Sequence, residues 1–217
     1  LDDVLVQARD QELPQVQAIA LHSRAVLAAH KGDQSEGLKL AHEAFSLTTN
    51  SADRDAVLGD IAAMFTLLGL YDAARDSHLI LAATSQSSVV RAQATINLME
   101  LASIDGMADA FDSYARELAS SRLSPWMRAH YLLYLGEGMD RLGRRDASED
   151  ALKEAISFAD ANQIHQVSFK AQSALSTVRA SVRPSKSFVA PPAWMPEEVS
   201  SVVRAISELR KTAVAAA

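Results

Sequence analysis

Apolar residues recur along most of the chain in segments with helical spacing, and the alternation of period two that marks a strand is missing. Alanine and leucine, which favour helices, are abundant. Between Pro14 and Pro184 the only proline is Pro125, so little interrupts a helix over that stretch. This pattern predicts an all-α protein.

Four of the eight glycines stand at a constant spacing of 37 residues, at Gly32, Gly69, Gly106 and Gly143. Each follows one periodic apolar segment and precedes another, where a helix end favours a residue in the left-handed conformation. Small or apolar residues recur five and twelve positions after each glycine, as Ala74 and Leu81 do after Gly69. A fixed spacing of this size indicates a stacked repeat array.

The segments between these glycines predict pairs of helices. We place the first helix of each pair at 15–31, 52–68, 88–104, 125–142 and 163–182. We place the second helices at 34–48, 71–84, 107–120 and 146–160. Ser124 before Pro125 predicts an N-cap followed by a first-turn proline. Two acidic pairs fit a capping box, Asp33 with Glu36 and Asp146 with Glu149.

The regular spacing ends near residue 180, where Ala180 replaces the expected glycine. Residues 183–196 hold four of the six prolines and predict a non-helical strap. We expect Phe188 and Trp194 to dock this strap on the array, and a competing hypothesis places the strap in the groove as an internal plug.

Pro196 then opens a closing helix that we expect to run to about Lys211. Its apolar residues fall on one face, which should cover the last repeat as a cap. The predicted organisation is therefore a repeat array over 1–182, a proline-rich strap over 183–196, and a capping helix and tail over 197–217.

The turn formed by Gly69, Tyr71 and Ala74 resembles the G-x-Y-x-x-A turn of the tetratricopeptide repeat, a helix–turn–helix unit of about 34 residues. Leu135-Gly136 fits the Leu-Gly pair in the first helix of that motif. The resemblance extends over residues 15–182. It implies a right-handed α-α superhelix, a solenoid of about four and a half helix pairs plus the capping helix. It also implies a concave groove, lined by the first helices, that receives a peptide or a partner helix.

Counting back from each glycine gives the positions that should face this groove. The residues expected to bind the partner are His22, Val26, His30, Gln93, Glu100, His130, Glu137, Asp140, Arg141 and Lys170. The Lys, Arg and Asn clamp that grips a chaperone tail in this family is absent. The acidic positions favour a partner with basic residues instead. The alternative is that they are solvated charges, with Glu137 or Asp140 paired to Arg141 or Arg144.

The composition of the chain argues against several classes of binding partner. The net charge of −6 and a pI near 5.5 argue against a nucleic-acid-binding surface. No apolar run reaches the roughly 20 residues that cross a bilayer, and the absence of cysteine excludes thiolate chemistry and disulfides. We therefore expect a cytoplasmic protein with no nucleic-acid or membrane partner, and the start at Leu1 suggests a processed chain or a piece of a longer one.

Motifs for catalysis, metals or cofactors are missing. There is no H-E-x-x-H and no G-x-S-x-G, and His22 and His30 have no third ligand near in sequence. Gly136 and Gly138 look faintly like a phosphate-loop fragment but fall in mid-helix. We expect no enzyme, metal or cofactor. The aromatic residues Trp126, Tyr131 and Tyr134 are expected to pack between units.

The leading hypothesis is a protein–protein interaction scaffold that belongs to a larger protein. The alternative is a regulatory or sensor domain of a bacterial signalling or transcription regulator, which binds a small ligand or a peptide. A third hypothesis is a structural, self-associating protein.

Overall fold

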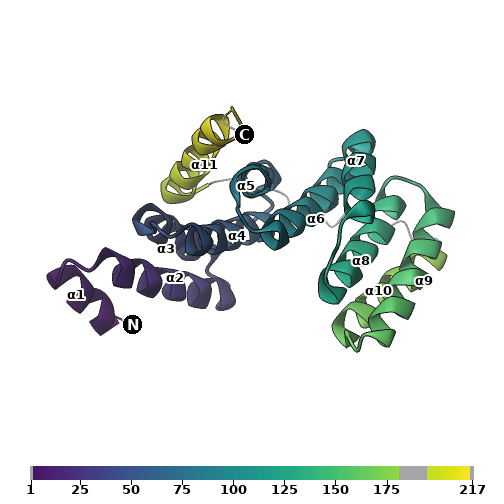
Figure 1. Ribbon diagram of the computed structural model, residues 1–217, viewed down its shortest axis with the longest axis horizontal. Coiled ribbons are helices and arrows are strands. Elements are labelled where there is room, and N and C mark those ends of the chain that lie inside the picture. Colours follow the sequence, from purple (N-terminus) through teal and green to yellow (C-terminus); the bar gives the residue numbers. More distant parts are fainter. Residues whose placement is uncertain (1, 181–194, 216–217) are drawn as a thin grey trace. The chain divides into compact units, whose positions relative to one another are not determined.

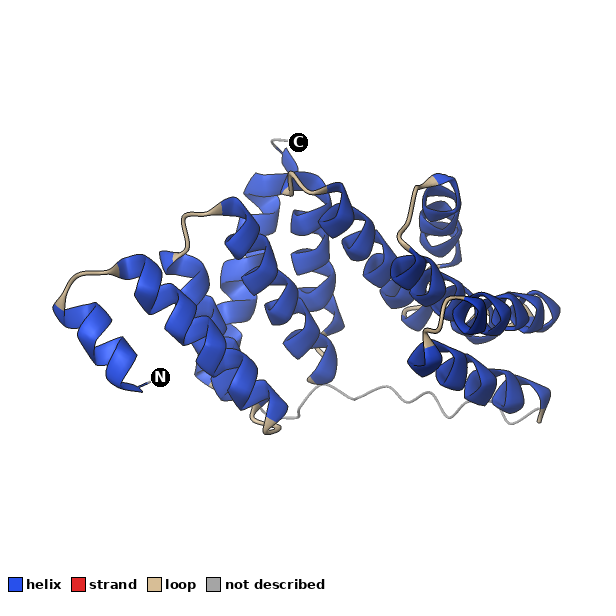
Figure 2. Cartoon of the chain, turned by 60° about the horizontal axis from the view of Figure 1, so that its bottom comes forward, coloured by secondary structure: helices blue, strands red, loops and turns tan. Residues whose placement is uncertain are grey.

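A computed structural model of the chain describes residues 2–180 and 195–215. Over these residues it contains eleven α-helices and no strand (Figure 2). The prediction of an all-α protein is confirmed. Phe188, Trp194 and all of the predicted strap except its last two residues lie outside the described residues. None of the described helices combines the length and apolar composition that crossing a bilayer requires.

The helices fall into two compact units. The described part of the first unit is residues 2–91 and 195–215, and that of the second is 92–180. The first unit contains α1 (Asp2–Asp10), α2 (Pro14–His30), α3 (Gln34–Leu47), α4 (Ser51–Leu67), α5 (Tyr71–Thr84) and α11 (Glu197–Ala215). The second contains most of α6 (Ser88–Ile104), and α7 (Ala108–Ser120), α8 (Pro125–Arg141), α9 (Arg145–Ala161) and α10 (His165–Arg179).

The nine helices predicted between residues 15 and 182 are all present, with ends that differ by a few residues. Helix α1 was not predicted. It is short and largely polar, and it buries only Leu5 and Ala8. The closing helix begins where predicted and extends four residues beyond Lys211.

The four equally spaced glycines all adopt a left-handed backbone. Their φ angles are +88° at Gly32, +72° at Gly69, +72° at Gly106 and +77° at Gly143. The residue that follows each glycine is the N-cap of the next helix. An L-residue with a side chain is strained in this conformation, which explains why glycine recurs there.

Two of the three predicted caps are confirmed. Asp33 accepts a hydrogen bond from the backbone N–H of Glu36 at 3.1 Å, and Ser124 accepts one from Met127 at 3.3 Å. The predicted cap at Asp146 is wrong, because α9 begins at Arg145 and Asp146 lies inside its first turn. The turn geometry makes the residue after the glycine the cap, and that residue is Arg144.

In the first unit, successive helices pack against each other from α1 to α5, and α11 packs against α5 and α3 (Figure 1). The buried face of α11 carries Val199, Val202 and Ile206. Arg210 Nε lies 3.0 Å from Asp76 Oδ1 on α5. The prediction that this helix covers the last repeat is therefore wrong: its partners are helices near the start of the chain, and Asp76 offers Arg210 a counter-charge there.

The second unit depends on glycines within α8 for close helix packing. A Cβ at Gly136 would lie 2.6 Å from Leu152 Cγ, and a Cβ at Gly138 would lie 2.8 Å from Phe111 Cζ. Phe111 and Leu152 are fully buried. The glycines that looked faintly like a phosphate loop are thus contact points that allow α8 to approach its neighbours, and they fix the face that α8 presents to the site described next.

Candidate functional site

A groove of about 360 Å³ lies between the C-terminal half of α8 and α10 in the second unit. Its lining combines charged, hydroxyl and apolar side chains: Glu137, Asp140, Arg141, Phe169, Lys170, Ser173, Ala174, Thr177 and Val178. On each helix these residues are spaced three or four apart, which places them on one face. Four of the predicted partner-binding residues line this groove, namely Glu137, Asp140, Arg141 and Lys170.

Arg141 is held in place by two hydrogen bonds. It donates from Nη1 to Ser103 Oγ on α6 at 3.0 Å, and from Nη2 to Glu137 Oε2 at 3.3 Å. The pair with Glu137 spans one helical turn, as the solvated-charge hypothesis predicted. The predicted alternative partner, Arg144, pairs with Asp112 on α7 instead. Arg141 therefore has a fixed position at the edge of the groove.

Glu100 on α6 belongs to the same group of charges. Its side chain is partly buried, and it does not line the groove. Burial raises its pKa to about 7, against the lowering effect of Arg141, and the negative charge of Glu137 adds to the rise. The positive charge of Lys170 also lowers the pKa of Glu100, less than Arg141 does.

The neighbouring acidic groups are affected in the same direction. Burial raises the pKa of Glu137, and the Arg141 guanidinium opposes this rise. Burial also raises the pKa of the Tyr134 hydroxyl, and the charges of Glu100 and Glu137 raise it further. These shifts show that α6 and α8 hold several acidic groups where water solvates them poorly.

An aromatic row lies along α8 next to this cluster. The ring centroids of Trp126 and His130 are 3.9 Å apart, and those of His130 and Tyr134 are 6.2 Å apart in an edge-on arrangement. His130 donates from Nδ1 to the backbone oxygen of Trp126 at 2.9 Å. We expected Trp126, Tyr131 and Tyr134 to pack between units. Tyr131 is buried, as this expectation requires, whereas Trp126 is 52% exposed.

Two further predicted residues of the second unit, His130 and Gln93, are not among those that line the groove. Burial lowers the pKa of His130, and the charge of Lys170 lowers it as well. Gln93 donates from Nε2 to Asn97 Oδ1 on the next turn of α6 at 3.2 Å.

The predicted residues of the first unit do not line this groove. His22 on α2 forms a 2.7 Å contact from Nε2 to Asp60 Oδ2 on α4. Val26 is partly buried and His30 is exposed. No cluster of three or more histidine or carboxylate side chains suited to a metal ion occurs in the part of the chain that the structure describes.

Sequence reasoning missed Phe169, which lines the groove and is 74% exposed. The signal was available, because the buried residues of α10 are Val167, Ala171 and Val178 among others, and Phe169 falls off that face. An aromatic side chain on the polar face of a helix is a recognisable candidate for contact with a partner.

Comparison of the chain with protein-family models finds no match, and searches of curated proteins and of solved structures give none either.

Proposed function

We propose that the chain is a tetratricopeptide-like helical-repeat scaffold that binds a peptide or a partner helix, with the groove between α8 and α10 as part of its binding surface. The constant glycine spacing and the paired helices α2–α3, α4–α5 and α8–α9 support the repeat architecture. The observation that carries the binding proposal is the groove itself, which places the charged side chains of Asp140 and Lys170 beside the exposed ring of Phe169. Fixed polar groups next to exposed aromatic surface are typical of a site that contacts a partner.

The charges around the groove favour a partner segment that carries basic residues. The lining carries two carboxylates, Glu137 and Asp140, and two cations, Arg141 and Lys170. Arg141 already donates to Ser103 and Glu137. Glu137 is thus already paired, whereas Asp140 forms no ion pair among the described residues, and a basic residue of the partner complements it.

Phe169 adds apolar contact to this polar groove. Its exposed ring lines the groove, and Ala174 and Val178 are the other apolar members of the lining. Interfaces that bind specifically combine aromatic contact area with a few fixed polar groups. The arrangement fits an extended segment or a helix whose basic residue is flanked by an apolar one.

Selection from a library of displayed random peptides tests this proposal. The full chain is expected to select peptides enriched in arginine or lysine, and Asp140→Lys should weaken their binding, measured by fluorescence anisotropy. Asp150→Lys is the matched control, because Asp150 is an exposed carboxylate on α9 outside the groove. Selection of no peptides, or equal affinity for the two variants, would contradict the proposal.

A further inference from the structure

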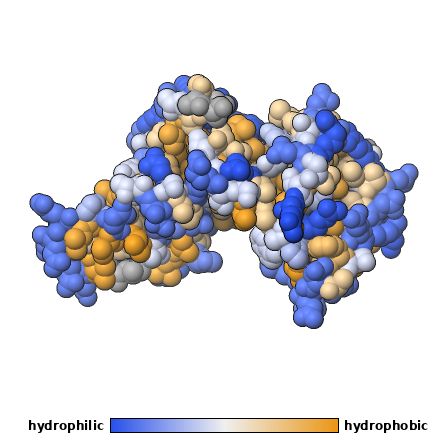
Figure 3. Space-filling model, viewed as in Figure 1, coloured by the Kyte–Doolittle hydropathy of each residue, from blue (hydrophilic) through white to orange (hydrophobic). Residues whose placement is uncertain are grey.

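One face of α2 is exposed to solvent although it is mostly apolar. Val16, Ile19 and Leu27 are 40%, 63% and 47% exposed, and the exposed Ser23 lies between them. Their spacing of three or four residues places the four side chains in one stripe along the helix. Figure 3 shows apolar surface over α1 and α2. A contiguous apolar stripe of this kind marks a contact with another molecule.

The stripe can be covered without burying an unpaired polar group. Between Leu13 and His30 the one Lys, Arg, Asp or Glu residue is Arg24, which forms an ion pair with Asp2 on α1 at 2.9 Å. The Ser23 hydroxyl donates to the backbone oxygen of Ile19 at 2.9 Å, so it needs no further partner. Contact with another apolar surface therefore carries little desolvation penalty here.

The two ends of α2 carry opposite charges. Glu12 precedes the helix and Lys31 follows it, both are exposed, and neither forms an ion pair with another described residue. Asp33, which is close to Lys31 in sequence, already accepts a hydrogen bond from Glu36 as the N-cap of α3. An antiparallel copy of α2 complements this pattern, because it brings the negative end of one helix to the positive end of the other.

We propose that the stripe of Val16, Ile19, Ser23 and Leu27 binds the same stripe of a second copy of the chain, with the two α2 helices antiparallel about a twofold axis near Ser23. A twofold contact requires a self-complementary surface. About this axis Ile19 of one copy lies opposite Leu27 of the other, and the small Ser23 side chains face each other at the centre.

The end charges fit the same register. Glu12 of one copy lies within about one helical turn of Lys31 of the other, which two long side chains can span. The inference goes beyond the proposed function, because α2 belongs to the first unit and the groove between α8 and α10 belongs to the second. Either can fail without the other.

The size of the contact predicts a weak dimer. Helix α2 has 17 residues and is about 25 Å long, so a contact confined to it is at the lower end of specific interfaces. We expect a dissociation constant of about 10–100 µM.

Sedimentation velocity of the full chain, at concentrations on both sides of this range, measures the association. Ile19→Glu should weaken it by at least about tenfold, because the contact would bury a charge without a partner. Val89→Glu is the matched control and should have no effect, because Val89 is an apolar residue that is 61% exposed on α6, outside the stripe. Thermal melting checks that both variants are folded.

Exchange of the end charges tests the antiparallel orientation. Glu12→Lys and Lys31→Glu should each weaken the dimer by about two- to tenfold, because like charges then meet at both ends. A mixture of the two variants should associate more strongly than either variant alone, since opposite charges meet again. In a parallel pair the like charges would already face each other, and neither single variant would weaken it.

A single introduced thiol tests the position of the axis, because the chain contains no cysteine. Ser23→Cys should form a disulfide between two copies under mild oxidation. Ser46→Cys is the control, because Ser46 is exposed on α3 and donates to the backbone oxygen four residues earlier, as Ser23 does.

The inference is overturned if the chain stays monomeric over the whole concentration range, which would leave the stripe to a different protein. It is also overturned if Ile19→Glu associates as strongly as the wild type, if neither charge variant weakens the dimer, or if Ser46→Cys forms the disulfide as readily as Ser23→Cys.

Discussion

At the scale of single residues, glycines inside helices differ in what a methyl group would meet. A Cβ at Gly138 would clash with Phe111 and lie 3.0 Å from Ser103 Cβ, whereas a Cβ at Gly59 in α4 would meet nothing within 4 Å. We expect Gly138→Ala to destabilise the second unit by about 1–3 kcal/mol through overpacking. Gly59→Ala should stabilise the first unit by about 0.5–1 kcal/mol, because alanine favours a helix.

Urea unfolding measures the free energy of unfolding of both variants, which should fall for Gly138→Ala and rise for Gly59→Ala. If Gly138→Ala were as stable as the wild type, the close approach of α8 to its neighbours would be incorrect. The packing of α8 at Gly138 matters for the groove, because α8 also carries Glu137 and Arg141.

Because of the buried His78 in α5, we expect the first unit to lose stability in acid. Its side chain is 5% exposed, its Nδ1 has no hydrogen-bond partner among the described residues, and burial lowers its pKa to about 4. The unfolded chain takes up this proton near pH 6.5 and the folded chain only near pH 4. The stability of the first unit should therefore decrease between pH 6.5 and pH 4, by up to about 3 kcal/mol.

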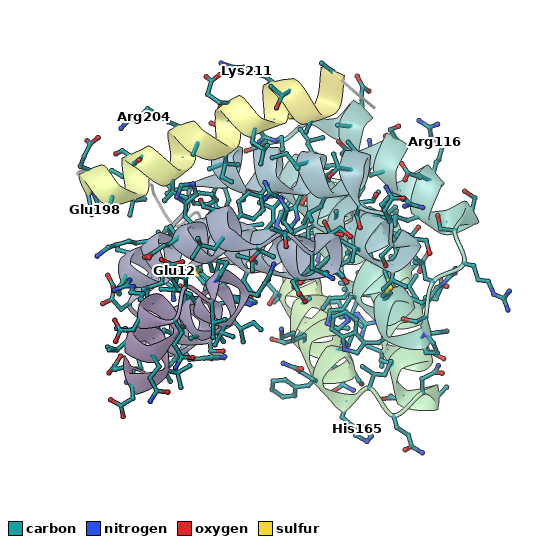
Figure 4. All side chains as sticks on the ribbon, turned by 60° about the vertical axis from the view of Figure 1, so that its left-hand side comes forward. Glu12, Arg116, His165, Glu198, Arg204 and Lys211 are labelled. Carbon is teal, nitrogen blue, oxygen red and sulfur yellow. The ribbon has the colours of Figure 1, made fainter. Side chains whose placement is uncertain are left out.

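Urea titrations at several pH values, followed by the NMR signals of α5, give this slope. His78→Leu should remove most of it. His165→Leu is the control, because His165 projects from the start of α10 (Figure 4). A slope that is unchanged in His78→Leu would show that another group accounts for the acid sensitivity.

The residue scale also shows what a sequence can and cannot predict. The left-handed turns at Gly32, Gly69, Gly106 and Gly143 were predictable, because few other residues adopt that backbone. The surroundings of Glu100 could not be predicted. Its charge could be read from the sequence, but its burial depends on how α6, α8 and α10 pack together.

At the scale of helices, some features of α11 follow from the local sequence pattern and others follow from tertiary packing. Its range and its apolar face were predicted from Pro196 and the spacing of valines and isoleucine. Its partners were not, because an apolar face specifies burial but not the surface that buries it. Figure 4 shows Arg204 and Lys211 on the side of α11 opposite to α3 and α5.

The packing of α11 on α5 and α3 predicts a local effect of mutation. Ile206 is 1% exposed, so Ile206→Ala should destabilise the first unit by about 2–5 kcal/mol. Arg204→Ala, at a side chain that is 65% exposed, should change stability by no more than about 0.5 kcal/mol.

Hydrogen exchange measures this effect by region. Protection of the amides in α3 and α5 should fall in Ile206→Ala, and protection in α8 and α9 should be retained. If α8 and α9 lost protection instead, α11 would cover the last helix pair, as the sequence alone suggested.

The helices α1 and α2 carry exposed apolar side chains at Val6, Val16, Ile19 and Leu27, and Figure 3 shows apolar surface over this region. Their exposure shows that periodic apolar residues do not always mark a core face.

At the scale of the whole molecule, the helical pairs could be predicted because the glycine spacing is constant, whereas the ligand could not. Most of the predicted binding residues of the second unit gather around one groove or beside it. Which of their hydrogen-bonding groups already have partners differs from residue to residue, and Arg141 already donates to Ser103 and Glu137. That balance follows from the assembled structure rather than from residue identities.

The most direct test of the central claim is NMR mapping of a selected basic peptide on the full chain. The account predicts that the amide shifts that change with peptide concentration belong to α8 and α10, with the largest changes near Asp140, Phe169 and Lys170. Changes confined to α7 and α9, or to the helices of the first unit, would contradict it.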